Sequence, residues 1–159
     1  MRTPKFKKAV KRKSSISNCV RDGKYKSKLE SYCARKLNEI GVEYQYEGVS
    51  YKLLDSFKYK GIYYKTTPKS TLMKDMTGTT HLPISYTPDF VSVEHKFIIE
   101  TKGFILSNHS FPLRWKLFMH YLYTNDMNDY MVFMPKNQKQ VDQVMAILQK
   151  HITHEKGVV

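Results

Sequence analysis

The apolar positions of the chain first fall into a regular pattern after a basic N-terminal stretch. Over residues 27–40 they recur every three or four positions, which is the spacing of one face of an α-helix: Leu29, Cys33, Leu37 and Ile40. Gly41 follows directly, and glycine suits the left-handed backbone position just beyond a helix. The pattern therefore predicts one amphipathic helix over residues 27–40.

The next segments have strand character. Residues 42–47 alternate between apolar and polar side chains, and residues 49–54 predict a second extended piece. The aromatic stretch FKYKGIYYKT predicts a short hairpin that turns near Gly61. The polar stretch after it, PKSTLMKDMTGTT, favours a long loop.

Two apolar runs in the second half of the chain predict the core of a sheet. Residues 86–93 (YTPDFVSV) and 96–102 (KFIIETK) predict two short strands joined by a tight turn. The continuous apolar run at positions 97–99 is typical of a strand buried on both faces. Residues 112–123 then predict a helix, and residues 130–134 predict another buried strand.

The last helix has the clearest pattern. Asn137 and Gln140 have the spacing of a capping box at its start. One apolar stripe then runs along the helix: Val141, Val144, Met145, Leu148 and Ile152. The order helix, strands, helix, strand, helix predicts an α/β fold in which helices flank a small mixed β-sheet.

Length and composition are those of one folded domain. With 159 residues and 41% hydrophobic residues, we expect a single domain over residues 27–159 with an inserted loop around residues 52–80. No apolar run approaches the length of a membrane-spanning helix, and no apolar segment follows the charged start. We therefore expect a soluble intracellular protein. Cys19 and Cys33 lack the spacing of a metal site and are expected to be reduced thiols.

The positive charge is concentrated at the N-terminus. Residues 1–28 hold 11 Lys or Arg and one acid, so they carry most of the formal net charge of +13. We expect residues 1–26 to form a flexible basic arm that binds DNA phosphates through its cluster of cations: Lys7, Lys8, Lys11, Arg12 and Lys13. A solubilising tail or a membrane-surface anchor are the alternatives, but no long apolar face accompanies these charges.

The candidate chemistry lies at the end of the central apolar strand. Glu100 and Lys102 are two residues apart, so in a strand they share a face while Thr101 points away. If the strand over residues 86–93 pairs with this one, Asp89 lies opposite its end. Two close carboxylates repel each other unless a cation lies between them, and carboxylate oxygens suit Mg²⁺ or Mn²⁺. An exposed cross-strand salt bridge is the alternative interpretation.

These residues resemble a known nuclease signature. Pro88-Asp89, followed after ten residues by Glu100-Thr101-Lys102, is similar to the PD-(D/E)xK motif. The sequences YTPDF and ETKG, with the upstream helical SKLE, resemble the phage endonuclease I family of Holliday-junction resolvases. The resemblance covers residues 27–47 and 85–103. The long insertion around residues 52–80 departs from it.

The resemblance implies a restriction-endonuclease-like core and Mg²⁺-dependent cleavage of branched DNA by a homodimer, which in that family is domain-swapped. It implies that Asp89 and Glu100 bind the metal and that Lys102 is the catalytic lysine. Glu30 would complete the metal site, although Ser27-x-x-Glu30 also has the spacing of a capping box. If the chain is encoded by a phage, the host cytoplasm is the expected location.

Two further readings of the function stay open. The same chemistry serves a site-specific homing or nicking endonuclease, and the inserted segment leaves room for that change of substrate. A DNA-binding protein without catalysis is the alternative from another class, although such a protein gains nothing from acids that face phosphate. In the helix over residues 112–123, Arg114 and Lys116 are candidate contacts to the DNA backbone or solvated surface charges.

Overall fold

The computed structural model describes residues 23–68, 70–103 and 110–156. The helices in these ranges are α1 (Lys28–Glu39), α2 (Phe111–Thr124) and α3 (Gln138–Lys156). The strands are β1 (Gln45–Tyr46), β2 (Tyr51–Leu54), β3 (Phe57–Lys58), β4 (Tyr64–Thr67), β5 (Ser70–Asp75), β6 (Thr80–His81), β7 (Ile84–Tyr86), β8 (Phe90–Ser92), β9 (Phe97–Ile99) and β10 (Met131–Phe133). Within the described ranges, no helix is long and apolar enough to cross a membrane.

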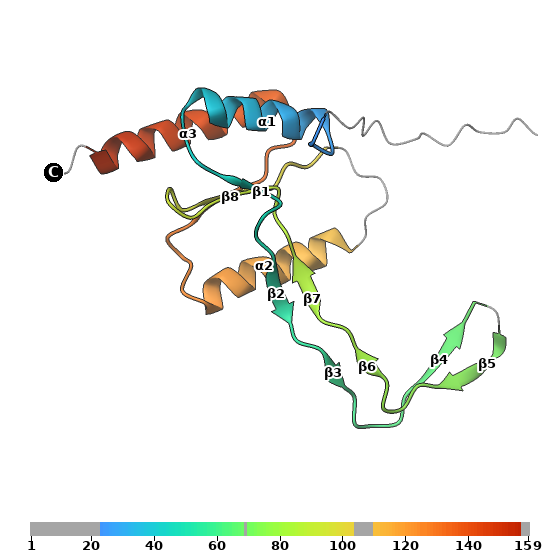
Figure 1. Ribbon diagram of the computed structural model, residues 1–159. Coiled ribbons are helices and arrows are strands. Elements are labelled where there is room, and N and C mark those ends of the chain that lie inside the picture. The colour runs from blue at the N-terminus through green and yellow to red at the C-terminus, as the bar shows by residue number, and fades with distance from the viewer. Residues whose placement is uncertain (1–22, 69, 104–109, 157–159) are drawn as a thin grey trace, which may run out of the picture.

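A four-stranded mixed sheet lies at the centre of the molecule, with the strand order β1-β8-β9-β10. Strand β8 pairs antiparallel with β1 and β9, whereas β10 runs parallel to β9. Figure 1 shows α1 and α3 lying side by side over one face of this sheet, while α2 lies on the other side. The predicted α/β class, with helices flanking a small mixed sheet, is confirmed.

Successive residues of β9 contribute to two apolar cores. The first core lies between the sheet and the helices α1 and α3, and it includes Phe97 and Ile99. The second lies between the sheet and α2, and it includes Ile98 and Phe118. Because side chains alternate along a strand, both faces of β9 are buried. The prediction from the continuous apolar run is therefore confirmed.

The helices agree with the sequence pattern, but one predicted strand does not. Ser27 caps α1 by accepting a hydrogen bond of 3.1 Å from the Glu30 amide, and the described part of α3 begins at Gln138, as its capping motif predicted. The strand predicted over residues 86–93 is instead two strands, β7 and β8, which belong to different sheets. Pro88 lies between them and has no amide hydrogen for a ladder, so a continuous strand was the wrong prediction.

The segment from residue 51 to residue 86 forms a long two-stranded ribbon. Three antiparallel pairs follow one another outward: β2 with β7, β3 with β6, and β4 with β5. Figure 1 shows this ribbon leaving the sheet and helices and extending far from them. The predicted long loop and the hairpin turning near Gly61 are therefore wrong. Strands β2 and β3 pair with β7 and β6, which are distant in sequence, and the local hairpin of β4 with β5 turns between Thr67 and Ser70 rather than at Gly61.

The base of the ribbon is anchored on α2. The rings of Tyr51 and Tyr86 lie 5.2 Å and 4.7 Å from the ring of Phe118, and both tyrosines are buried. Beyond this base, most side chains of β3, β4, β5 and β6 are exposed. The ribbon therefore has a base that packs on α2, formed by β2 and β7, and an exposed outer part, formed by β3, β4, β5 and β6.

Candidate active site

Asp89 lies directly before β8, where the central sheet opens. The pairing of β8 with β9 places Asp89 opposite the end of β9, as predicted. Its main-chain carbonyl accepts a hydrogen bond of 2.9 Å from the Glu47 amide. Its side-chain Oδ2 accepts two hydrogen bonds of 2.7 Å, from the amide and the hydroxyl of Thr101. Beyond the end of the β8–β9 pairing, the Asp89 carboxylate therefore links the two segments in place of main-chain hydrogen bonds.

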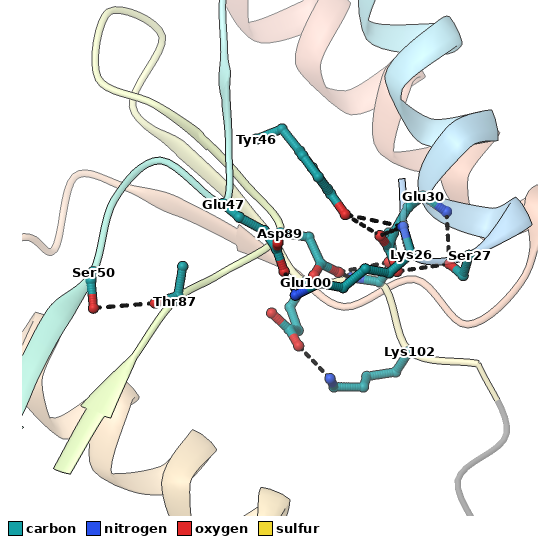
Figure 2. A network of polar contacts seen from close by, with 11 residues as sticks. Lys26, Ser27, Glu30, Tyr46, Glu47, Ser50, Thr87, Asp89, Glu100 and Lys102 are labelled. Carbon is teal, nitrogen blue, oxygen red and sulfur yellow. Dashed lines mark hydrogen bonds and ion pairs between the residues drawn. The ribbon is translucent and has the colours of Figure 1, made fainter. Parts of the chain in front are cut away.

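Glu100 and Lys102 follow β9 at the same edge of the sheet. Their amides donate hydrogen bonds of 2.9 Å to the carbonyl oxygens of Phe133 and Pro135, which extends the parallel pairing with β10. Glu100 is only 4% exposed, and its Oε1 forms an ion pair with Lys102 Nζ (Figure 2). Lys102 Nζ also lies 4.2 Å from the centre of the Phe111 ring. The predicted proximity of Glu100 and Lys102 is confirmed.

Thr101 does not point away from the site, so that prediction is wrong. Its hydroxyl and amide both face Asp89, because residues 100–102 lie beyond the end of β9 and its β8 partner. The amides of Glu100 and Lys102 donate to Phe133 and Pro135, at and just beyond the end of β10, and the Thr101 amide between them donates to the Asp89 carboxylate. Thr101 therefore fixes the position of Asp89. The prediction missed this role because it assumed that the regular alternation of a strand continues to residue 102.

The two carboxylates are held in a costly arrangement. Burial and, next, the charge of Glu100 raise the pKa of Asp89 to about 7, although the hydrogen bonds from Thr101 lower it. Glu100 Oε2 is buried and accepts no hydrogen bond of regular geometry from the described residues, although the Tyr86 hydroxyl lies close to the Glu100 carboxylate. A buried carboxylate oxygen without a donor destabilises the fold. The alternative of an exposed cross-strand salt bridge does not fit this burial.

Glu30 lies beside this edge, at the start of α1, and is 7% exposed. Its Oε1 accepts a hydrogen bond of 2.8 Å from the Ser27 hydroxyl. Its Oε2 accepts one of 2.8 Å from the Lys26 amide and another from the Tyr46 hydroxyl (Figure 2). Glu30 therefore acts in the helix cap. Its charge also reaches the site, because it contributes to the raised pKa of Asp89.

Lys26 and Glu47 also lie at this edge of the sheet, and the sequence analysis did not identify them. Lys26 Nζ forms an ion pair with Glu47 Oε1. The hydrogen bond to Glu47, the charge of that residue and, after it, the charges of Glu30 and Asp89 raise the pKa of Lys26, although desolvation lowers it. Figure 2 shows both side chains next to Asp89. Only the long-range pairing of β1 with β8 brings Glu47 here, so its local sequence gave no signal.

Tyr86 and Arg114 line the side of the site that faces α2. The Tyr86 hydroxyl and Arg114 Nε are buried and have no hydrogen-bond partner among the described residues. Burial and the Glu100 carboxylate raise the pKa of Tyr86, and the charge of Arg114 lowers it, so the three groups are neighbours. Arg114 is half-buried, unlike a solvated surface charge, whereas Lys116 is exposed on α2.

Two carboxylates at this edge, those of Asp89 and Glu100, have the hard oxygen donors that a divalent cation prefers. Asp89 and Glu100 are close enough to repel each other, and Glu100 Oε2 needs a partner, which a hard cation would provide. In Glu30 both carboxylate oxygens already accept hydrogen bonds. Within residues 23–68, 70–103 and 110–156, no three His, Cys, Asp or Glu side chains are arranged as ligands of one ion.

The remaining predicted residues lie elsewhere. Lys7, Lys8, Lys11, Arg12 and Lys13 fall outside the residues that the structure describes, as does Cys19. Cys33 is buried as a free thiol beneath the site, and burial raises its pKa to about 12, which agrees with the predicted reduced state.

Comparison with known proteins gives no relative for the chain. It matches no protein-family model, no curated protein sequence and no solved structure. The function therefore has to be inferred from the geometry of the site and from the short motif in the sequence.

Proposed function

We propose that this protein is a metal-dependent DNA endonuclease of the PD-(D/E)xK type, which hydrolyses phosphodiester bonds. One observation carries the proposal. The Glu100 carboxylate is buried at the edge of the central sheet, with one oxygen paired to Lys102 and the other without a hydrogen-bond partner among the described residues. Buried, crowded charges are costly to fold, and they are concentrated where proteins bind ions and perform chemistry.

Each residue at the edge has a distinct task in this proposal. Lys102 provides a positive charge that stabilises the negative charge developing on the scissile phosphate and orients the attacking water. Its ammonium is held between the Phe111 ring and the Glu100 carboxylate, which limits its freedom before DNA binds. Thr101 is a positioning residue, because it donates two hydrogen bonds to one oxygen of Asp89.

Asp89 and Glu100 are the residues that would hold Mg²⁺ or Mn²⁺, and the charge of Glu30 supports them. When bound, such an ion polarises the phosphodiester and lowers the pKa of a coordinated water. Arg114 has a buried Nε without a partner among the described residues. Like Glu100, it is a close neighbour of Tyr86, so it is placed to bind a phosphate oxygen.

Branched DNA is the proposed substrate class, on the strength of the motif resemblance to phage junction resolvases. The ribbon favours a second candidate, a site-specific homing or nicking endonuclease, because a two-stranded ribbon fits the major groove, where base sequence is read. A four-way junction of arbitrary sequence and a linear duplex library distinguish these substrates. Selective cutting of the junction supports the first candidate, whereas selective cutting of one duplex sequence supports the second.

Cutting two strands usually takes two active sites, and the resembled family is dimeric, so we also propose that the enzyme acts as a homodimer. Sedimentation velocity at micromolar concentration should then give about twice the chain mass of 18.8 kDa. A strict monomer that makes double-strand cuts would contradict the dimer while leaving the chemistry of the site unaffected.

The central experiment is single-turnover cleavage of labelled junction, nicked and linear DNA, in Mg²⁺ and in EDTA. The wild-type protein should cut in Mg²⁺ only. Lys102→Ala should lower the rate by about a hundredfold or more, since it removes a preorganised charge from the transition state. DNA affinity, measured by fluorescence anisotropy in EDTA, should change little.

Lys36→Ala is the matched control for Lys102→Ala. Lys36 is also an ion-paired, partly buried lysine near an aromatic ring: its side chain is 29% exposed, against 21% for Lys102, and its partner is Glu39. The control should cut at the wild-type rate. The proposal fails if the wild-type protein cuts no DNA in Mg²⁺, or if Lys102→Ala cuts as fast as the control.

A further inference from the structure

The outer part of the ribbon exposes apolar side chains that a soluble surface normally covers. Ile62 is 81% exposed, Leu82 80% and Leu72 75%. An isolated two-stranded hairpin is only marginally stable in water, and this one exposes several large apolar side chains along its length. Both features indicate that a partner covers the ribbon when the protein works.

The charges of the ribbon indicate which partner that is. Its described residues include five lysines and two aspartates. Lys52 forms an ion pair of 2.7 Å with Asp55, and Asp75 accepts hydrogen bonds from Thr77. Four lysines remain without an ion pair among the described residues: Lys58, Lys60, Lys65 and Lys74. The outer ribbon is therefore a positively charged surface.

Two of these lysines lie opposite each other. In the register of β4 and β5, Lys65 pairs directly with Lys74, so their side chains lie on the same face of the hairpin. Like charges in such a pair destabilise the strands, and this cost is removed when an anion lies over both ammonium groups. The pair therefore favours a polyanion over an apolar partner.

The dimensions of the ribbon favour duplex DNA among polyanions. Strands in a ribbon lie about 4.8 Å apart, and the major groove is about 12 Å wide and admits a two-stranded ribbon. A second copy of the chain is a poorer partner, because it would bring one positively charged ribbon against another. The exposed apolar residues then contact sugars and base edges, while the lysines contact phosphates.

We propose that the outer ribbon is a second DNA-binding element, which grips duplex DNA at a distance from the bond that Lys102 and its neighbours cut. This inference rests on the proposed function. It deepens that function by assigning to the inserted segment the binding of a duplex arm of the substrate, separate from the catalytic edge.

The test is a paired substitution at the hairpin, Lys65→Gln with Lys74→Gln. Affinity for a fluorescein-labelled duplex and for a four-way junction is measured by anisotropy in EDTA over a series of salt concentrations. Each lost phosphate contact should reduce the slope of log affinity against log salt by about 0.9, so the double variant should lose about 2. At physiological salt the affinity should fall by about tenfold or more. Lys65→Arg with Lys74→Arg should keep the wild-type affinity.

The control is Lys96→Gln with Lys150→Gln, which removes the same charge from the turn before β9 and from α3. Equal affinity and equal salt slope for the hairpin variant and this control would overturn the inference. A hairpin variant that loses self-association but binds DNA normally would also overturn it, in favour of a dimer contact. Because binding is measured in EDTA, a wild-type protein that cuts no DNA would defeat the proposed function alone, and the role of the ribbon would still be decided.

Discussion

The edge of the central sheet and the outer ribbon both carry charged side chains, but those at the edge are buried and those on the ribbon are exposed. At the edge, Glu100 is 4% exposed and crowded against other ionic groups, whereas the lysines of the ribbon are exposed. Burying a charge costs much more free energy than leaving it in water. The comparison teaches that the two regions suit different tasks: the proposed catalysis needs a preorganised charge at the edge, and the proposed DNA binding needs exposed charge on the ribbon.

Removing one carboxylate from the edge should have the largest effect. Asp89→Asn and Glu100→Gln keep the size of the side chain but take away the charge that would hold a cation. Cleavage should fall by about a thousandfold or more, since catalysis and ion binding are both lost. Binding to DNA in EDTA should become slightly tighter, because a negative charge near phosphate is gone.

Asp129→Asn is the control for these two variants. Asp129 is an exposed aspartate that pairs with Lys96 at the other end of β9, so its loss should change neither rate nor affinity. If Glu100→Gln cleaves like Asp129→Asn in a single-turnover assay, the edge is not a catalytic site and the contrast with the ribbon disappears.

The next largest effect should come from a second basic region, the N-terminal arm. Residues 1–20 contain seven Lys or Arg and no acid. Deleting them should weaken DNA binding by at least about tenfold and flatten the salt dependence, while the single-turnover rate at saturating protein stays the same. The measurement is anisotropy beside cleavage at saturation. An unchanged salt slope would show that the arm makes no phosphate contacts, and DNA affinity would then have to come from other regions such as the ribbon.

The sequence predicted well where the physical cause was local. The apolar period and the cap fixed α1 to within one residue at each end, because helix hydrogen bonds join residues four apart. The proximity of Asp89, Glu100 and Lys102, the proposed catalytic residues, also followed from a short spacing. One turn joins two adjacent strands, so the pairing of β8 with β9 was visible in a segment of a few residues.

The rest depended on contacts between distant segments. Strands β2 and β3 pair with β7 and β6 more than twenty positions away in sequence, so local patterns did not reveal these pairs. The β4–β5 hairpin is local, but most of its sequence is polar and rich in turn residues, which favoured a loop. Glu47 reaches Asp89 only because β1 joins β8. The buried Arg114 and Tyr86 likewise meet Glu100 through the packing of α2 on the sheet. Local patterns contain none of this information.

A smaller effect should separate the position of the Asp89 carboxylate from its charge. Thr101→Val removes the hydroxyl that donates to Asp89 at 2.7 Å but keeps the amide that donates to the same oxygen. A hydrogen bond to a charged group contributes about 1.5–3 kcal/mol, so the cleavage rate should fall by about tenfold to a hundredfold. Thr101→Ser should restore it. The comparison of rate and melting temperature for both variants decides whether the effect is on the site, since a purely structural role would lower stability and leave the rate of folded protein unchanged.

The smallest expected effect tests Glu30, and a second helix supplies its control. In α1, the Glu30 amide donates to Ser27 Oγ at 3.1 Å, and the Lys26 amide donates to Glu30 Oε2 at 2.8 Å. In α3, the Gln140 amide donates to Asn137 Oδ1 at 3.0 Å, and the Lys136 amide donates to Gln140 Oε1 at 2.7 Å. The two caps share one geometry, and a neutral glutamine is sufficient for the second.

Glu30→Gln should keep the hydrogen bond from the Lys26 amide that caps α1, while it removes the buried charge and turns one of the two accepting oxygens into a donor. If that charge supports Asp89 and Glu100, the single-turnover rate should fall by about fivefold, which corresponds to about 1 kcal/mol, with a smaller loss of melting temperature than for Glu30→Ala. Glu30→Ala should in addition lower the stability by about 1 kcal/mol through the lost cap. Gln140→Glu, the reciprocal change in α3, should leave the rate unchanged. Wild-type turnover by folded Glu30→Gln would show that Glu30 is a helix cap and that the catalytic edge ends at Asp89, Glu100 and Lys102.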